Sequence, residues 1–107
     1  MTDQLQNMPD VLPRPWYWDD SDLAKQLYKE ISENHVLFSR PLKAIGRRQD
    51  NDDVLFQFEN GDFGYAVVHL TWSQKKLLDP KYPRTKLYSD WNDLYINRIL
   101  VDSIDFE

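Results

Sequence analysis

The sequence predicts an α+β domain in which an antiparallel sheet of three or four strands carries an N-terminal and a C-terminal helix. Three observations support this fold class: a length of 107 residues, apolar residues at helical spacing near both ends, and alternating apolar residues between them. A chain of this length suits one domain and is too short for two. We therefore expect an extended N-terminal arm over residues 1–15 and a single domain over residues 16–107.

Both helices are predicted from capping residues followed by apolar residues three and four positions apart. Ser21 follows two aspartates and can cap a helix that runs to about Asn34. Ser89 can cap a second helix. The inward face of that second helix is expected to carry Trp91, Leu94, Tyr95, Ile99 and the aliphatic stem of Arg98. The tail, residues 101–107, can add an edge strand or pack on the domain.

The central strands are predicted to form a hairpin over residues 54–59 and 63–72. Between them stands Asn60-Gly61, the dipeptide favoured in two-residue type I′ turns. In this pairing Phe56 lies opposite Tyr65 and Val54 opposite Val67. Both faces of the hairpin are then largely apolar, which is typical of central strands that are covered on both sides. A helix is expected on one face, with the aromatic arm or a partner on the other.

Two further strands complete the predicted sheet. Residues 42–48 form the first, with Gly46 as a bulge or a point of close approach, and residues 84–88 form the last. The segment between the hairpin and the last strand, residues 73–83, is polar, basic and rich in proline, which indicates a long loop. Trp16-Tyr17-Trp18 is expected to dock on the domain.

Composition excludes several classes of function. The chain has no cysteine, so a disulfide scaffold, a thiolate zinc site, an iron–sulfur cluster and a cysteine nucleophile are excluded. Its net charge of −5 argues against a general affinity for nucleic acid. No apolar stretch approaches the length needed to span a bilayer, and no signal-like segment opens the chain. We expect a cytoplasmic protein in a reducing compartment, with no cofactor.

The strongest candidate for chemistry is a cluster at one end of the hairpin. The predicted register places Asp52 opposite His69, and a carboxylate bonded to one imidazole nitrogen leaves the other free to exchange protons. Arg47, Arg48 and Asp53 lie on the adjoining segment. The alternative is structural: the arginines and aspartates form surface ion pairs and His69 is a satisfied strand residue.

Other candidate sites have less support. Ser73 lies four residues after His69, but neither a nucleophile elbow nor an oxyanion-hole glycine pattern accompanies it. Residues 50–53 resemble the start of an EF-hand loop without its glycine and terminal glutamate, so no metal site is predicted. His35 is expected at a helix end, in a structural role.

A binding surface is also indicated by basic and aromatic residues. Arg47, Arg48, Trp72 and Tyr82 are the candidate binding residues. The basic stretch over residues 75–86 resembles a surface for single-stranded nucleic acid, but the rest of the chain is acidic. Acidic ends with exposed aromatic residues suit a protein partner that has a basic surface.

Two segments carry a resemblance to a known group of proteins. Asp-Asp-Val-Leu-Phe at residues 52–56 and Ala-Val-Val-His-Leu-Thr-Trp at residues 66–72 resemble segments shared by small uncharacterised bacterial proteins. The resemblance covers roughly residues 18–102, and the second segment is its specific part. It implies a bacterial cytoplasmic protein and no particular mechanism.

Three functions follow as hypotheses. The first is a non-enzymatic protein-interaction module, of which an immunity or antitoxin-like inhibitor is one form. The second is a small hydrolase or ligand-binding enzyme that uses His69 with Asp52 or Asp53, and Arg47 or Arg48 for an anionic substrate. The third is an RNA-binding accessory protein that uses its basic loop. The surroundings of His69 discriminate between the first two.

Overall fold

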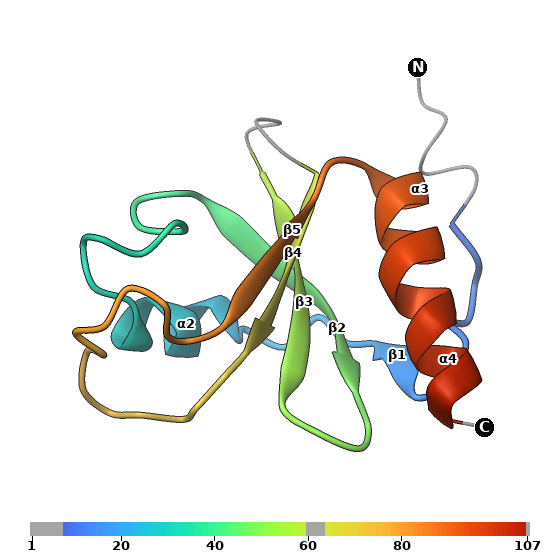
Figure 1. Ribbon diagram of the computed structural model, residues 1–107, viewed down its shortest axis with the longest axis horizontal. Coiled ribbons are helices and arrows are strands. Elements are labelled where there is room, and N and C mark those ends of the chain that lie inside the picture. The colour runs from blue at the N-terminus through green and yellow to red at the C-terminus, as the bar shows by residue number, and fades with distance from the viewer. Residues whose placement is uncertain (1–7, 60–63, 107) are drawn as a thin grey trace.

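The computed structural model describes residues 8–59 and 64–106 and shows an α+β fold with two helical segments on one twisted sheet (Figure 1). In chain order its elements are β1 (Trp16–Trp18), α2 (Ala24–Glu30), β2 (Leu42–Arg48), β3 (Asp53–Phe58), β4 (Tyr65–His69), β5 (Thr85–Tyr88), α3 (Trp91–Leu94), the π-helical turn η1 (Tyr95–Ile99) and α4 (Leu100–Phe106).

The sheet has five antiparallel strands in the order β1-β2-β3-β4-β5, so the prediction of three or four strands was wrong. The additional strand is β1, which was expected only to dock as an aromatic cluster. Trp16 pairs with Arg48, and Trp18 pairs with Gly46. Three residues are too few to show a strand period in the sequence, and their pairing with β2 is decided by tertiary contact.

Strand β2 has the predicted bounds, and the predicted bulge at Gly46 is confirmed. The β2–β3 register shifts between Ala44 and Gly46. A Cβ atom on Gly46 would lie 3.2 Å from the carbonyl oxygen of Tyr17, so glycine allows the close approach of β1.

The register of the β3–β4 hairpin differs by one residue from the predicted register. Val54 pairs with Val68 where Val67 was predicted, and Phe56 pairs with Ala66. The backbone N–H of Phe58 donates to the carbonyl of Gly64 at 3.2 Å, which continues the same register toward the turn. The predicted turn at Asn60-Gly61 lies outside the described residues. A shift of one residue changes which side chains from the two strands share a face.

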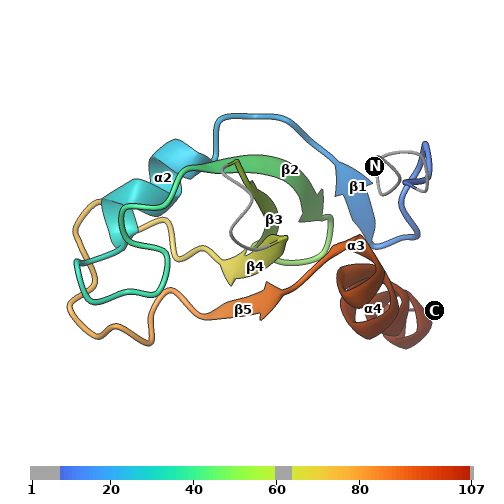
Figure 2. The same ribbon diagram turned by 90° about the horizontal axis from the view of Figure 1, so that it is seen from above.

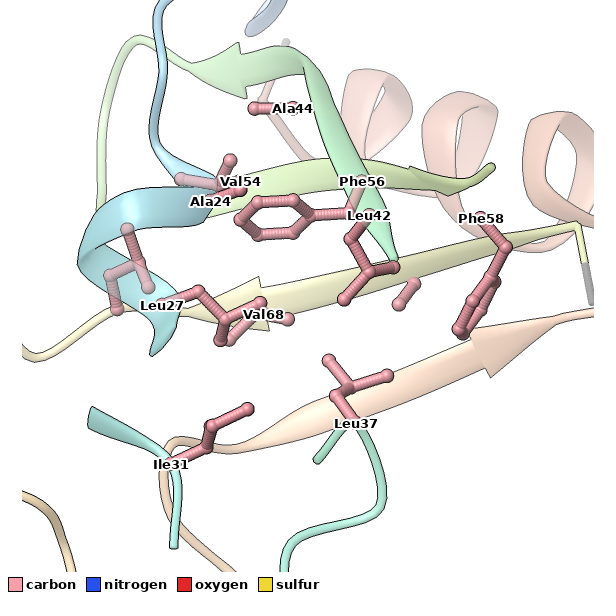
Figure 3. Packing of buried hydrophobic residues seen from close by; sticks show 12 residues of the cluster. Ala24, Leu27, Ile31, Leu37, Leu42, Ala44, Val54, Phe56, Phe58 and Val68 are labelled. Carbon is pink, nitrogen blue, oxygen red and sulfur yellow. The ribbon is translucent and has the colours of Figure 1, made fainter. Parts of the chain in front are cut away.

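Both faces of the hairpin are buried, as predicted. On one face, side chains of β2, β3 and β4 pack against α2 and the segment that follows it (Figure 3). This layer consists of Ala24, Leu27, Ile31, Leu37, Leu42, Ala44, Val54, Phe56, Phe58, Ala66, Val68 and Leu70.

The opposite face is covered by the C-terminal helix together with the chain before β1. Figures 1 and 2 show this helix on the side of the sheet away from α2. The layer consists of Leu12, Trp16, Leu55, Tyr65, Val67, Tyr88, Trp91, Leu94 and Ile99. Trp18 stacks on Trp91 with ring centroids 5.9 Å apart, which joins the aromatic strand β1 to the helix.

Helix α2 is shorter than predicted, and Ser21 does not cap it. Leu23 is the N-cap and has no capping side chain, while the hydroxyl of Ser21 donates to Asp19. The helix ends at Glu30 because Ile31 adopts an extended conformation and forms an isolated parallel bridge with Leu77. Residues 32–34, predicted to be helical, therefore belong to a turn.

The C-terminal helix is continuous over α3, η1 and α4. Its N-cap is Asp90, which accepts a hydrogen bond from the backbone N–H of Asp93 at 2.8 Å, where Ser89 was predicted to be the cap. The tail was expected to add an edge strand or to pack on the domain. It forms no strand and continues the helix to Phe106. The predicted inward residues Trp91, Leu94 and Ile99 are buried.

A buried carboxylate holds the chain after β4 against α2. Glu30 is fully buried, and its two oxygens accept hydrogen bonds from four donors. These donors are the N–H and hydroxyl of Thr71, the N–H of Trp72 and the side-chain amide of Gln26, at 2.8–3.0 Å. No helix or strand is assigned between β4 and β5 apart from the bridge at Leu77, which agrees with the predicted long loop.

Replacing Glu30 by glutamine is expected to lower the free energy of unfolding by about 2 kcal/mol or more. The glutamine amide places N–H groups against donors that now point at an oxygen, so buried donors lose their acceptor. Urea unfolding measures the loss. Glu33→Gln, at an exposed position, is the matched control and should change stability little. Equal effects of the two substitutions would contradict the role of Glu30.

Asp93→Asn is expected to make stability less dependent on pH. Hydrogen bonding from the backbone N–H of Ser89 is the main cause of an Asp93 pKa below its usual value of 3.8, and Asn97 adds to it. The ionised carboxylate therefore stabilises the fold above the unfolded pKa, and this contribution is lost as pH falls through the folded pKa.

Urea unfolding at about pH 7 and about pH 3 checks this prediction, with Asp105→Asn on the exposed side of α4 as control. The Asp93 variant should be less stable than the wild type at the higher pH, and the difference should shrink at the lower pH. A difference that is constant with pH would refute the electrostatic origin.

Candidate functional site

A histidine–aspartate pair lies where β3 begins and β4 ends. Asp53 and His69 are directly opposite each other in the β3–β4 ladder, and the Nδ1 of His69 is 2.7 Å from the Oδ1 of Asp53. A carboxylate can only accept, so Nδ1 carries the proton in this bond. In the neutral ring, Nε2 is then the proton acceptor.

The partner of His69 is Asp53, whereas the predicted register placed Asp52 there. The Asp52 side chain is exposed, and its backbone carbonyl accepts the N–H of Leu70 at 3.1 Å. The predicted register assumed a two-residue turn, and the observed register is displaced by one residue. This displacement places His69 on the face of β3 that carries Asp53, so Asp53 and not Asp52 shares a face with the histidine.

Asp53 is fixed from its other side by Arg98 of the C-terminal helix. The Nη2 of Arg98 donates to the Oδ2 of Asp53 at 2.7 Å, and its Nε donates to the Oδ2 of Asp102 at 2.8 Å. Burial alone would lower the pKa of the Arg98 guanidinium, but hydrogen bonds with Tyr88 and Asp102 raise this pKa above its usual value. Arg98 is thus a permanent cation that holds the carboxylate of Asp53 in place.

Asp102 extends this arrangement into a network across four strands and the helix. Its Oδ2 accepts from Arg98, from the indole N–H of Trp16 at 2.9 Å and from the Nη1 of Arg48 at 3.1 Å. Arg48 also forms a bidentate pair with Asp50, and this hydrogen bond raises the pKa of Arg48 and lowers that of Asp50. His69 therefore stands at the end of a continuous chain of ion pairs.

Arg47 and Arg48 lie on opposite faces of the sheet. Arg47 is paired with Val54 of the α2-side layer, and its guanidinium lies 5.8 Å from the ring centroid of Trp72. Arg48 is joined to the His69 cluster by its ion pair with Asp102 and interacts with Asp53 electrostatically over a longer distance. Of the two arginines proposed for an anionic substrate, the structure places neither against His69.

The residues that do surround His69 form a pocket of about 430 Å³ on the face of the C-terminal helix. It is lined by Asp53, Val67, His69, Arg84, Thr85, Lys86 and Arg98. The His69 side chain is half exposed, at 50%. Within residues 8–59 and 64–106, its Nε2 atom has no hydrogen-bond partner.

Arg84 and Lys86 are the site residues that sequence reasoning missed. The backbone N–H of His69 donates to the carbonyl of Arg84 at 2.9 Å, and Lys86 is directly opposite Val67, so both cations share the face of His69. Alternating cations in a predicted strand were the available signal. The pairing of that strand with β4 could not be read from the sequence. Tyr82 lies beside this group, 5.5 Å from the Arg84 guanidinium.

The second histidine, His35, has a structural role, although it is not at a helix end as predicted. It is buried in the turn after α2, and its Nδ1 accepts the N–H of Leu37 at 3.0 Å. Its Nε2 lies 3.0 Å from the carbonyl of Pro83, to which it donates. Nδ1 therefore stabilises the turn that contains His35, and Nε2 joins this turn to the loop before β5.

Comparisons of the chain with protein-family models, with curated proteins and with solved structures give no match in any of the three. The protein is therefore described by its fold and its candidate site alone. It is an α+β domain with a five-stranded antiparallel sheet and a pocket lined by a His–Asp pair and cations. Among the described residues, no group of three or more His, Asp or Glu side chains is placed to hold a metal ion. None of the described helices has the length and apolar character needed to cross a membrane.

Asp53→Asn is expected to lower the free energy of unfolding by about 1–3 kcal/mol, because Arg98 loses one of its two charged partners. The ring nitrogen signals of His69 in NMR should shift as well, since Nδ1 loses a carboxylate. Asp52→Asn is the matched control on the adjacent residue, and it should leave both measurements nearly unchanged. Equal responses from the two variants would contradict the observed register.

Proposed function

We propose that this chain binds a small anionic ligand in the His69 pocket and that His69 exchanges a proton with it. One observation carries the proposal: a half-exposed imidazole, fixed through Nδ1 by Asp53, opens into a pocket whose other polar groups are mainly cations. This combination of a concave site with an oriented titratable group is typical of ligand-binding and catalytic sites.

The charge of the ligand is inferred from which cations are already paired. Arg98 is occupied by Asp53 and Asp102. Arg84 and Lys86 have no carboxylate within ion-pair distance in the part of the chain that the structure describes. Two cations without a direct ion-pair partner lie beside the imidazole, although Asp93 interacts electrostatically with Lys86 over a longer distance. They favour a phosphate or a carboxylate over a neutral or cationic ligand.

The chemistry supported by this arrangement is general acid–base catalysis with water as nucleophile. Asp53 fixes the tautomer of His69 and leaves its Nε2 available to accept a proton. Covalent catalysis by Ser73 has no support, because its hydroxyl donates to the carbonyl of Lys75 at 2.6 Å. Hydrolysis of an anionic ester is therefore the reaction class that we propose for this site.

The sequence also bears on two further proposals, the cellular location of the protein and RNA binding as an alternative function. The absence of cysteine and the resemblance to small bacterial proteins support a location in the bacterial cytoplasm. The proposed ligand would then be a cytoplasmic molecule. RNA binding has less support, because one lysine of the basic loop is used inside the fold. The Nζ of Lys76 donates to the carbonyls of Tyr28 and Ile31 at 3.2 and 3.1 Å.

Titration with inorganic phosphate, followed by NMR of the His69 ring, tests the binding proposal. We expect saturable shifts, and we expect the Arg84→Gln, Lys86→Gln double variant to bind roughly tenfold more weakly or worse. The Lys25→Gln, Lys43→Gln double variant removes the same charge from exposed positions on α2 and β2. Absence of saturation, or equal weakening in both double variants, would overturn a specific anion site.

A further inference from the structure

The last strand of the described sheet, β5, pairs with a neighbour on one side only. It is bonded to β4, and Figures 1 and 2 show no helix or strand along its outer side in the part of the chain that the structure describes. The opposite edge strand, β1, differs, because the N–H of Trp16 already donates to the carbonyl of Pro13 at 3.0 Å. An uncovered edge strand can accept a strand from another chain.

The register shows which backbone groups of β5 face outward. The N–H of His69 donates to the carbonyl of Arg84, so the next residue of β5 that bonds to β4 in this antiparallel ladder is Lys86. The N–H and C=O groups of Thr85 and Leu87 therefore point away from β4. Among the described residues, no loop or turn bonds to these groups. They leave alternating donors and acceptors for an added strand.

The side chains of β5 give this edge a different character on each face. Arg84 and Lys86 lie on the face of His69, whereas Leu87 packs against the α2-side layer and is only partly buried. Within the described residues neither cation has a carboxylate at ion-pair distance, although Asp93 attracts Lys86 over a longer distance. An added strand would thus meet positive charge on one face and a partly exposed leucine on the other.

We propose that the outer edge of β5 binds an extended segment of another protein, in antiparallel orientation, in which acidic residues alternate with apolar ones. Residues opposite Arg84 and Lys86 share the face of these cations, so carboxylates there compensate both charges. An apolar residue opposite Leu87 extends the layer on the α2 side. In this orientation the apolar residues of the segment, and not the acidic ones, form the backbone hydrogen bonds to β5.

The charges of β5 argue against other occupants of its edge. Charged side chains on an edge strand discourage pairing with neutral or like-charged strands, which leaves an acidic strand as the exception. A second copy of the chain is a poor occupant, because two antiparallel β5 edges bring the cations of both copies together on one face. The inference shares Arg84 and Lys86 with the proposed anion site but does not rest on that site, since the bonding groups of the edge are backbone atoms.

Hydrogen exchange measured by NMR tests the inference with a defined peptide, acetyl-Thr-Glu-Val-Glu-Val-Glu-Thr-amide. Binding should be saturable and should slow exchange of the Thr85 and Leu87 N–H groups about tenfold or more, because both become hydrogen-bonded. The same peptide with lysine in place of glutamate should not bind, and binding of the acidic peptide should weaken with salt.

Protein variants check the contribution of the two cations. The Arg84→Gln, Lys86→Gln double variant should bind the acidic peptide about tenfold more weakly. The Lys25→Gln, Lys43→Gln double variant, which removes the same charge from exposed positions on α2 and β2, should bind it nearly as the wild type does. Equal weakening in both variants would refute charge complementarity at β5.

Backbone methylation of the peptide separates strand addition from simple charge attraction. N-methylation of the valines removes the N–H groups that face β5 and should abolish protection, whereas N-methylation of the glutamates should preserve it. No saturation, equal binding of the lysine peptide, equal effects of the two methylation patterns, or binding without protection of Thr85 and Leu87 would overturn the inference.

Inorganic phosphate distinguishes this inference from the proposed function. Phosphate bound beside His69 should shift the ring signals of His69 without protecting the N–H groups of Thr85 and Leu87. Saturable phosphate binding with no peptide binding would overturn the edge proposal alone. Peptide protection with no phosphate saturation would overturn the anion site and support the edge proposal.

Discussion

The constraint on which this structure depends is that β3 and β4 are apolar on both faces. Val54, Phe56 and Val68 belong to one buried layer, while Leu55 and Val67 belong to the other. Neither face can remain in water, since each exposed Å² of apolar surface costs about 25 cal/mol. The sheet therefore needs α2 on one side and the C-terminal helix on the other. Polar residues are left to the ends of the strands, where the covering helices stop.

At those ends, carboxylates that are buried or, for Asp102, partly buried connect the strands to the helices. Asp102 joins β1 and β2 to the C-terminal helix, Asp53 joins the sheet to that helix through Arg98, and Glu30 joins α2 to the chain after β4. Each acid has several donors, which compensates the cost of its burial. The same contacts orient His69. Structural ion pairs and the candidate site thus share residues here.

Much of this arrangement follows from local pattern. The bounds of β2, the bulge at Gly46, the two-sided burial of the hairpin and the buried residues of the C-terminal helix agree with prediction. The presence of a fifth strand and its pairing with β2 were not predicted, because β1 is only three residues long and pairs with a strand far along the chain. For the same reason Asp52 was placed against His69. One residue of register, set by how the turn closes, decides which of two adjacent aspartates faces the histidine.

The sequence by itself determined the α+β class and the presence of a polar end on the hairpin, because side-chain periodicity and capping act over a few residues. Tertiary structure alone decided that Arg98, Arg84 and Lys86 surround His69 while Arg47 turns to Trp72. These contacts join segments far apart in the chain, through the β4–β5 register and the docking of the C-terminal helix. The geometry of these contacts is set by the packing of two layers on one twisted sheet, and this packing cannot be predicted from local sequence.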